Sequence, residues 1–348
     1  MKSLKKTITT LSMTGLLAAG FCQSAVAVDT ATLGQEQITK HFVIAEGLEV
    51  PTETFSFTAA AVTKDAPDVT IDSISYSSAD NKGTLSTDGI YTLDKNAAIT
   101  FGTFPHAGTY EYTVTETDSK ADGITYDSTS YTMIVYVANG SDGKLAVQSI
   151  TVEAEDGKQE ELTFTNTYRK NGSLTISKKT EGTLADKTKD FAFTIEFFKS
   201  GTESDSVASY TGEIGSEDVA CNIGEKTTFY LHDNESLVFD NLPVGTRYVV
   251  TEVAAADGYT PSVSVVENGV ETVSNRTTAE ENALSTADTG SNLVGESENS
   301  VEYTNTYEDV PVTGLVLKNL PYLLLIVLPA LALILPVAAK SRMKKRKH

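Results

Sequence analysis

The stretch FTNTY at residues 164–168 returns as YTNTY at residues 303–307, and these two copies determine how the rest of the chain is interpreted. Each copy consists of aromatic and β-branched residues around an asparagine, which is typical of a β-strand. Residues two apart in a strand share a face, so Asn166 and Asn305 each lie on the same side as the apolar residues two and four positions before them. Both asparagines are therefore predicted to point into a core.

Three further segments repeat in the same order, which indicates an internal duplication. The repeated segments also keep their spacing. The lysine of the ITK or ISK segment and the glutamate of the YTVTE or YVVTE segment are 76 residues apart in the first copy and 74 in the second. That glutamate and the asparagine are 50 and 53 residues apart. The matching pairs are ITK 38–40 with ISK 176–178, FSFT 55–58 with FAFT 191–194, and YTVTE 112–116 with YVVTE 248–252.

The segments between these motifs are short, alternate between apolar and polar residues and are separated by turn residues, as in the predicted hairpin loop 139–143. No long amphipathic pattern indicates a helix. The predicted fold class is therefore all-β, with two tandem β-sandwich domains at residues 28–168 and 169–308. Residues 169–173 are the expected joint, and the polar segment 268–300 is expected to be a long exposed excursion.

A lysine and a glutamate share the core-facing side with each asparagine. By strand parity, Lys40 lies with Ile38, and Glu116 lies with the apolar residues two and four positions before it. The second copy repeats this with Lys178, Glu252 and Asn305; Lys179 is adjacent, but parity favours Lys178. Buried Lys and Glu are rare unless paired. A bulge could instead turn this face to solvent, but the duplication argues against that alternative.

The two copies resemble the isopeptide-forming sandwich domains of Gram-positive pilins, and the chain from near Ile38 to Gly314 resembles the two-domain major pilins of group A streptococcus. The resemblance implies immunoglobulin-like (CnaB-type) sandwiches. It also implies intramolecular bonds that join Lys40 to Asn166 and Lys178 to Asn305, with Glu116 and Glu252 assisting.

This chemistry is physically reasonable for buried groups. An ammonium cannot attack an amide, but burial lowers the pKa of lysine and raises that of glutamate, so a proton can pass from one to the other. The neutral amine then adds to the asparagine carbonyl while the protonated glutamate polarises that carbonyl and relays protons until ammonia leaves. Each domain reacts only once and with itself, so the chain is not expected to be an enzyme. It is also expected to need neither a cofactor nor a metal.

Residues 1–27 are predicted to be a secretory signal peptide. Lys2, Lys5 and Lys6 precede an apolar stretch at 11–21 and the small residues AVA at 25–27. The alternative of a first transmembrane helix is disfavoured because the apolar stretch is too short. Secretion with removal of these residues is the expectation.

The C-terminal residues 309–348 combine three features in a fixed order. VPVTG at 310–314 precedes a charge-free run at 320–339, which is long enough to span a membrane, and a basic tail that is expected to stay in the cytoplasm. This order resembles the cell-wall sorting signal of Gram-positive surface proteins, although Val310 stands where most such signals have Leu. The resemblance implies that a sortase cleaves between Thr313 and Gly314 and passes the Thr313 carbonyl to an amine, so that the chain becomes anchored to the wall after transient retention in the membrane.

Composition excludes several other functions. The whole chain has a formal net charge of −20, and every acidic residue lies between residues 28 and 313. Nucleic acid is an unsuitable partner for such a surface. Cys221 is the single cysteine outside the predicted signal, so no internal disulfide is expected. The four histidines are scattered and predict no metal site.

The combined features predict the repeating shaft subunit of a pilus. Such a subunit needs an acceptor lysine, and the resemblance places it shortly before the last strand of the first domain, where Lys158 is the best match. Lys144 and Lys170 are rivals, and a solvated turn lysine is the alternative for Lys158. Because head-to-tail linkage does not close, it gives a filament. The implied partners are identical subunits, a pilus-specific sortase, minor pilins and peptidoglycan, whereas host surface ligands are not specified by the sequence.

Two other classes of function stay open as alternatives. A monomeric wall-anchored adhesin or a minor pilin at the base or tip would share the sorting signal, but the chain has no Trp, and no additional head domain is expected. A wall-anchored hydrolase is disfavoured because Glu116 and Glu252 belong to separate domains and cannot form a glycosidase pair. Cys221 likewise has no evident histidine partner in the sequence.

Overall fold

The computed structural model describes residues 37–308 of the 348-residue chain. Its regular elements within that range are all β-strands. No helix among residues 37–308 is long and apolar enough to cross a membrane. The predicted signal peptide, the motif containing Thr313 and Gly314, and the predicted span at 320–339 lie outside the described residues.

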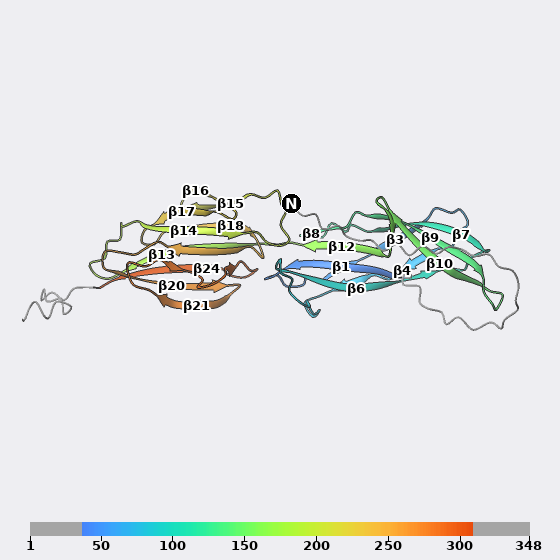
Figure 1. The fold of residues 1–348 in the computed structure, drawn as a ribbon, viewed down its shortest axis with the longest axis horizontal. Coiled ribbons are helices and arrows are strands. Elements are labelled where there is room, and N and C mark those ends of the chain that lie inside the picture. The colour runs from blue at the N-terminus through green and yellow to red at the C-terminus, as the bar shows by residue number, and fades with distance from the viewer. Residues whose placement is uncertain (1–36, 309–348) are drawn as a thin grey trace, which may run out of the picture.

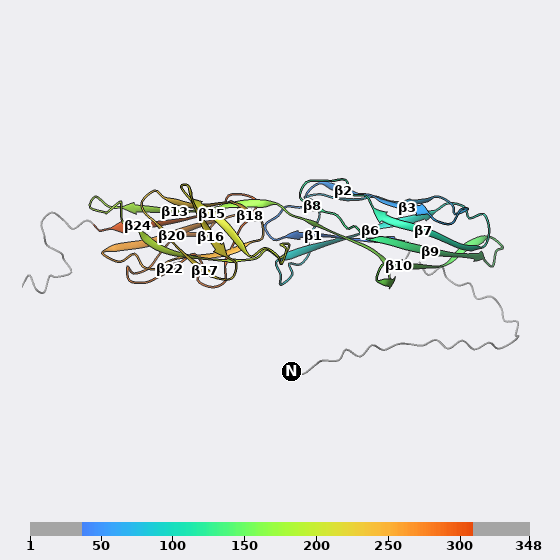
Figure 2. The same cartoon turned by 90° about the horizontal axis from the view of Figure 1, so that it is seen from above.

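The strands fall into two groups that lie end to end along the long axis of the molecule (Figures 1 and 2). The first group comprises β1 (Gln37–Ala45), β2 (Glu53–Phe55), β3 (Phe57–Ala61), β4 (Val69–Ile71), β5 (Ile74–Tyr76), β6 (Ile90–Phe101), β7 (Gly108–Glu116), β8 (Ile124–Thr125), β9 (Ser130–Asn139), β10 (Leu145–Ala154), β11 (Gly157–Gln159) and β12 (Leu162–Tyr168). The second comprises β13 (Asn171–Glu181), β14 (Phe191–Phe198), β15 (Ser209–Ile214), β16 (Glu217–Asn222), β17 (Lys226–Leu231), β18 (Ser236–Pro243), β19 (Arg247–Glu252), β20 (Tyr259–Glu267), β21 (Val270–Thr277), β22 (Leu284–Ser285), β23 (Asn292–Leu293) and β24 (Ser300–Tyr307).

Each group contains two principal sheets. In the first half the strand orders are β4-β6-β1-β12-β8 and β11-β10-β9-β7-β3, with a small separate ladder of β2 and β5. In the second half they are β16-β15-β18-β13-β24-β20-β21 and β17-β14-β19-β22, with β23 also paired to β19. The all-β, tandem organisation predicted from the duplication is confirmed for the described residues.

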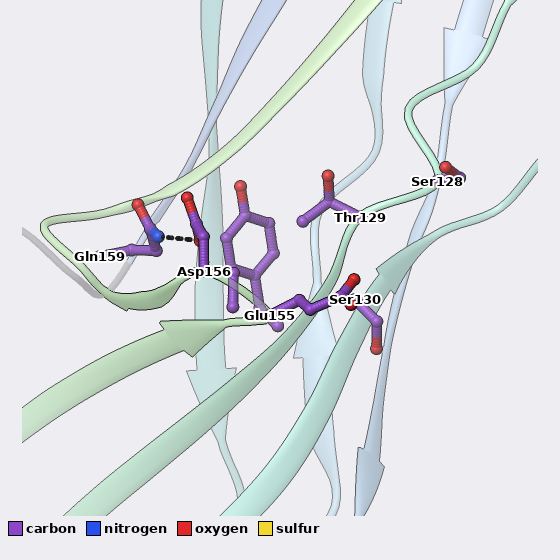
Figure 3. Close-up of a pocket in the computed structure, with 8 residues that line it drawn as sticks. Ser128, Thr129, Ser130, Glu155, Asp156 and Gln159 are labelled. Carbon is purple, nitrogen blue, oxygen red and sulfur yellow. Dashed lines mark hydrogen bonds between the residues drawn. The ribbon is translucent and has the colours of Figure 1, made fainter.

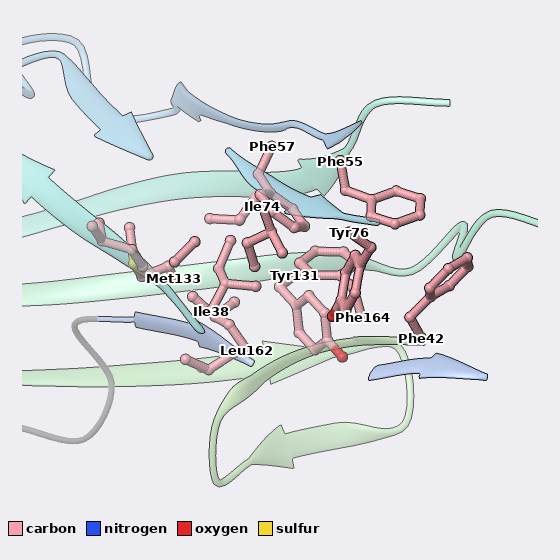
Figure 4. Packing of buried hydrophobic residues seen from close by; sticks show 14 of the residues in the cluster. Ile38, Phe42, Phe55, Phe57, Ile74, Tyr76, Tyr131, Met133, Leu162 and Phe164 are labelled. Atoms are coloured by element: carbon pink, nitrogen blue, oxygen red, sulfur yellow. The ribbon is translucent and has the colours of Figure 1, made fainter. Parts of the chain in front are cut away.

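Alternating burial along the strands produces two hydrophobic clusters, one in each half. In β1 every second residue from Ile38 to Ile44 is buried, as the period of a strand facing a core requires. Figure 4 shows the first cluster, where the rings of Phe42, Phe55, Tyr131 and Phe164 converge from four different strands. The ring centroids of Phe42 and Phe55 are 5.2 Å apart in an edge arrangement, which is favourable for aromatic pairs.

The first and last strands of each half are neighbours and run parallel. β1 pairs with β12 so that Phe42 faces Asn166, and β13 pairs with β24 so that Thr180 faces Asn305. In both halves the lysine therefore lies two positions before the residue that faces the asparagine. The duplicated sequence thus gives the same register twice.

Two sequence-based expectations about connections need correction. The polar segment 268–300 is not simply an exposed excursion, because it includes β21, β22 and β23 and buries Leu284, Val294 and Asn299. The Asn299 side chain donates to the backbone carbonyls of Ser173, Gly295 and Ser297, so its burial is satisfied by hydrogen bonds that composition does not reveal. The joint is also shorter than expected, since β12 ends at Tyr168 and β13 begins at Asn171.

The two halves meet in a polar junction around Glu296. One carboxylate oxygen of Glu296 accepts from the Glu49 backbone N–H at 2.7 Å, and the other accepts from Lys170 Nζ at 2.9 Å. Arg247 forms an ion pair with Glu46 across the same junction. Gly201 packs against the backbone of the other half so closely that a Cβ there would lie 2.1 Å from the Asp88 carbonyl oxygen.

Candidate functional site

In each half, a lysine, a glutamate and an asparagine are buried together between the two sheets. Lys40 and Asn166 come from neighbouring strands of one sheet, β1 and β12, whereas Glu116 comes from β7 in the facing sheet. The second half has the same division, with Lys178 and Asn305 on β13 and β24 and Glu252 on β19 of the facing sheet. The side chains of both Lys–Glu pairs have no exposed surface. The structure therefore brings together all six residues singled out by strand parity.

The first triad (Lys40, Glu116 and Asn166) is arranged around one carboxylate oxygen. Lys40 Nζ lies 2.9 Å from Glu116 Oε1, although the angle is not that of a hydrogen bond. Asn166 Nδ2 donates to the same oxygen at 2.9 Å. Asn166 Oδ1 accepts a hydrogen bond of 2.8 Å from the backbone N–H of Asp127. Glu116 thus contacts both the amine and the amide nitrogen, while the amide oxygen is held by the backbone.

The second triad (Lys178, Glu252 and Asn305) is similar but looser around its amine. Lys178 Nζ lies 3.8 Å from Glu252 Oε1 and donates to the Lys179 carbonyl at 3.0 Å. Asn305 Nδ2 donates to Glu252 Oε1 at 2.7 Å, whereas Asn305 Oδ1 has no hydrogen-bond partner among the described residues. The adjacent Lys179 is half exposed and pairs with Glu302, so Lys178 is the lysine within the core.

Burial shifts the ionisable groups of both triads toward their neutral forms. Desolvation lowers the pKa of Lys40 to about 8 against the opposing influence of Glu116, and it lowers the pKa of Lys178 to about 8 against Glu252. Desolvation raises the pKa of Glu116 and of Glu252, in each case opposed by the neighbouring lysine. A proton shared within each pair can therefore leave the amine neutral at moderate pH.

An aromatic ring covers each amine. Lys40 Nζ lies 4.7 Å from the ring centroid of Phe55, and Lys178 Nζ lies 4.5 Å from that of Phe191. These phenylalanines begin the repeated segments FSFT at 55–58 and FAFT at 191–194, whose sequence pattern predicts strands but no role beside the lysines. The recurrence of the two phenylalanines in the duplicated sequence is the feature from which this role could have been predicted. An apolar ring beside a buried amine keeps water away from that amine.

Comparison with known proteins follows the same two-part division. The chain is 26% identical over 344 residues to a pilin of Streptococcus pyogenes serotype M1, which covers 90% of this chain and 94% of that pilin. The chain is a pilin homologue. Residues 37–169 match the family described as Spy0128-like isopeptide containing domain, and residues 172–307 match a domain of unknown function.

The chain also resembles a pilus adhesin over a short segment and a solved pilin structure over most of its length. The chain is 42% identical over 84 residues to the pilus tip adhesin Cpa of S. pyogenes, covering 24% of this chain and 12% of the adhesin. Among solved structures, the major pilin protein T3.2 of S. pyogenes serotype GAS13637 is 23% identical, with a TM-score of 0.37 and coverage of 79% of this chain and 99% of that one.

The predicted acceptor of the pilin homologue, Lys158, lies on the short strand β11 and is exposed. Beside this hairpin is an open hollow of about 610 Å³ lined by Ser128, Thr129, Ser130, Tyr131, Ala154, Glu155, Asp156 and Gln159. Figure 3 shows Gln159 donating to Asp156 at its rim, at 2.6 Å. Of the rival lysines, Lys144 is exposed in its loop, whereas Lys170 pairs with Glu296 in the junction.

The other groups considered from the sequence do not form a site in the described part of the homologue. Cys221 is buried within the second cluster, and desolvation raises the pKa of its thiol, which disfavours a reactive thiolate. Residues 37–308 contain no group of three or more His, Cys, Asp or Glu that could hold a metal ion.

Proposed function

We propose that the chain is the structural shaft subunit of a covalently polymerised pilus on the cell surface, in which each domain cross-links itself through a Lys–Asn isopeptide bond. The observation that carries the proposal is the duplicated triad: in each half the lysine and the asparagine lie at the same register on the first and last strands, and the buried glutamate meets them from the facing sheet. The similarity to a pilin over most of the chain supports it, as does the match of residues 37–169 to an isopeptide-containing domain. The assignment of residues 28–168 and 169–308 to immunoglobulin-like, CnaB-type domains belongs to this proposal.

The geometry supports a defined sequence of proton and bond transfers. Glu116 takes a proton from the Lys40 ammonium, and the neutral Nζ adds to Cγ of Asn166. Glu116 Oε1, which contacts both nitrogens, then carries a proton from Nζ to Nδ2. The Cγ–Nδ2 bond breaks, ammonia leaves, and Glu116 is left protonated beside the new amide. Lys178, Glu252 and Asn305 react in the same way, and burial supplies the proximity that this slow reaction needs.

The position of the bonds accounts for a mechanical role. Each bond would join a first strand to the last strand that already lies beside it, closing a loop of 127 residues in the first domain. Closure of a loop of this size by a disulfide stabilises a fold by roughly 5 kcal/mol, and an isopeptide bond adds resistance to reduction. Tension between the ends of the molecule would therefore not separate the terminal strands.

Polymerisation completes the proposal. A sortase would cleave between Thr313 and Gly314 and join the Thr313 carbonyl to a lysine of the next subunit, with exposed Lys158 as the best acceptor. The described chain ends beyond β24, at the end of the molecule remote from the first domain (Figure 1), which favours head-to-tail growth. The remaining proposed steps are secretion through residues 1–27, membrane retention by residues 320–339, attachment to peptidoglycan and association with minor pilins.

A second candidate function is a minor pilin or adhesin at the pilus tip. The segment of 84 residues that is 42% identical to a pilus tip adhesin favours it. A shaft subunit occurs many times in each covalent polymer, whereas a tip subunit occurs once.

Denaturing electrophoresis of wall extracts tests the shaft proposal. We expect a ladder of high-mass species containing the wild-type chain, its loss in Lys158→Ala, and its persistence in the matched variant Lys144→Ala. A single discrete band from the wild-type chain contradicts the shaft function. A ladder that survives Lys158→Ala contradicts the acceptor assignment alone.

A further inference from the structure

The carbonyl oxygen of the reacting asparagine needs a donor that Glu116 does not supply. When an amine adds to an amide carbonyl, negative charge develops on the oxygen, and a positioned N–H stabilises it. Glu116 Oε1 contacts Nζ of Lys40 and Nδ2 of Asn166, and the contact to Asn166 Oδ1 comes from the backbone N–H of Asp127 at 2.8 Å. This differs from the sequence-based expectation that glutamate polarises the carbonyl.

The loop carrying that N–H is held against β12 by the side chain of the same residue. Asp127 Oδ2 accepts from the backbone N–H of Thr165, the residue before Asn166, at 2.8 Å. Asp127 Oδ1 accepts from the backbone N–H of Thr129, also at 2.8 Å. The short strand β8, just before this loop, pairs with β12 at Thr167 and Tyr168. Strand pairing and two carboxylate hydrogen bonds therefore fix the amide beside Oδ1.

The second domain has no counterpart to this arrangement. Its last strand, β24, is paired along its whole length with β20, a regular strand in which Pro261 faces Asn305. Asn305 Oδ1 has no hydrogen-bond partner among the described residues. The two triads thus share their acid–base group but differ in the donor to the oxygen.

We infer that the backbone N–H of Asp127 is a one-donor oxyanion site for isopeptide formation in the first domain, that the Asp127 carboxylate is its positioning group, and that the second domain closes more slowly because it lacks such a donor. The inference rests on the proposed isopeptide chemistry. In the addition step, the π electrons of the Asn166 carbonyl move onto Oδ1 and are stabilised by this N–H. They return when Cγ–Nδ2 breaks and ammonia departs, so the donor itself gains and loses nothing.

Replacing one backbone amide by an ester tests the donor directly. The full chain is made by translation in vitro with malic acid, the α-hydroxy analogue of aspartate, at position 127, so that the N–H becomes an oxygen and the carboxylate is kept. Closure of each domain is followed over time as loss of one ammonia from its cross-linked peptide. We expect closure of the first domain to slow by roughly 100-fold, while closure of the second domain in the same molecule is unchanged.

The outcomes separate this inference from the function on which it rests. If the ester chain closes its first domain at the wild-type rate, or if the second domain of the wild-type chain closes as fast as the first, the inference is wrong although the bonds form. If neither domain of the wild-type chain loses ammonia, the proposed isopeptide chemistry fails. Asp127→Ala is expected to slow closure of the first domain, and Asp127→Asn, which keeps one acceptor, to restore part of the rate. Equal rates in these two variants contradict the positioning role of the carboxylate.

Discussion

The two domains place the same three residues at the same strand register but surround them differently. In the first, Lys40 Nζ lies 2.9 Å from Glu116, whereas in the second Lys178 Nζ lies 3.8 Å from Glu252 and donates to a backbone carbonyl instead. The asparagine oxygen has a backbone donor in the first domain and no partner among the described residues in the second. Register thus determines which groups meet, whereas the neighbouring loops determine how well they are prepared to react.

The largest expected effect comes from removing the glutamate of one domain at a time. Glu116→Ala is expected to slow or abolish cross-linking in the first domain only, and Glu252→Ala in the second only, by roughly 10²–10⁴-fold as for loss of a general acid–base group. Peptide mapping measures each bond separately, so the domain without the substitution is the control. Loss of both bonds in either single variant contradicts two independent sites.

Loss of one bond should lower stability in that domain alone. Asn166→Ala removes the proposed target of Lys40. The free energy of unfolding of the first domain is expected to fall by roughly 5 kcal/mol, because the proposed bond would no longer close a loop of 127 residues. Asn305→Ala is the matched variant for the second domain. Calorimetry should show a downward shift of one transition in each variant, and an unshifted transition would show that the bond does not stabilise the fold.

The pH dependence of cross-linking distinguishes a shared proton from a simple need for neutral lysine. Below the raised pKa of Glu116 both groups are protonated and the ammonium cannot attack; above the lowered pKa of Lys40, about 8, the pair has lost the proton that glutamate must relay. The rate is expected to be highest between these limits and to fall about tenfold per pH unit above about 8. A rate that keeps rising through this range would assign glutamate no role as an acid.

The junction between the domains should matter least to stability. Glu296→Ala removes the carboxylate that binds the Glu49 amide and the half-exposed Lys170, and it is expected to cost roughly 1 kcal/mol or less. The control is Glu302→Ala, which breaks the exposed pair with Lys179 on the surface of the second domain. Denaturant unfolding should show a loss of unfolding free energy, relative to the wild type, that is smaller at high salt than at low salt. Cross-linking should be unaffected in both variants.

Strand parity and duplication were sufficient to predict the fold class and the six buried residues. A residue's face follows from its position in an alternating strand, so Lys40, Glu116 and Asn166 could be placed without knowing any loop. The environment of Asn166 could not be predicted, because Asp127 belongs to a loop with no copy in the second half and acts through its backbone. The buried portion of 268–300 was missed for a related reason: Asn299 is a polar residue satisfied by three backbone carbonyls, and composition does not distinguish that from exposure.

The most direct test of the proposed self-cross-linking is the intact mass of the chain isolated from the cell surface, together with peptide mapping. The predicted result is a mass lower by two molecules of ammonia, with one branched peptide joining Lys40 to Asn166 and another joining Lys178 to Asn305. The account would be contradicted by a mass from which no ammonia has been lost, with both lysines accessible to amine-specific labelling after denaturation and both asparagine side chains intact.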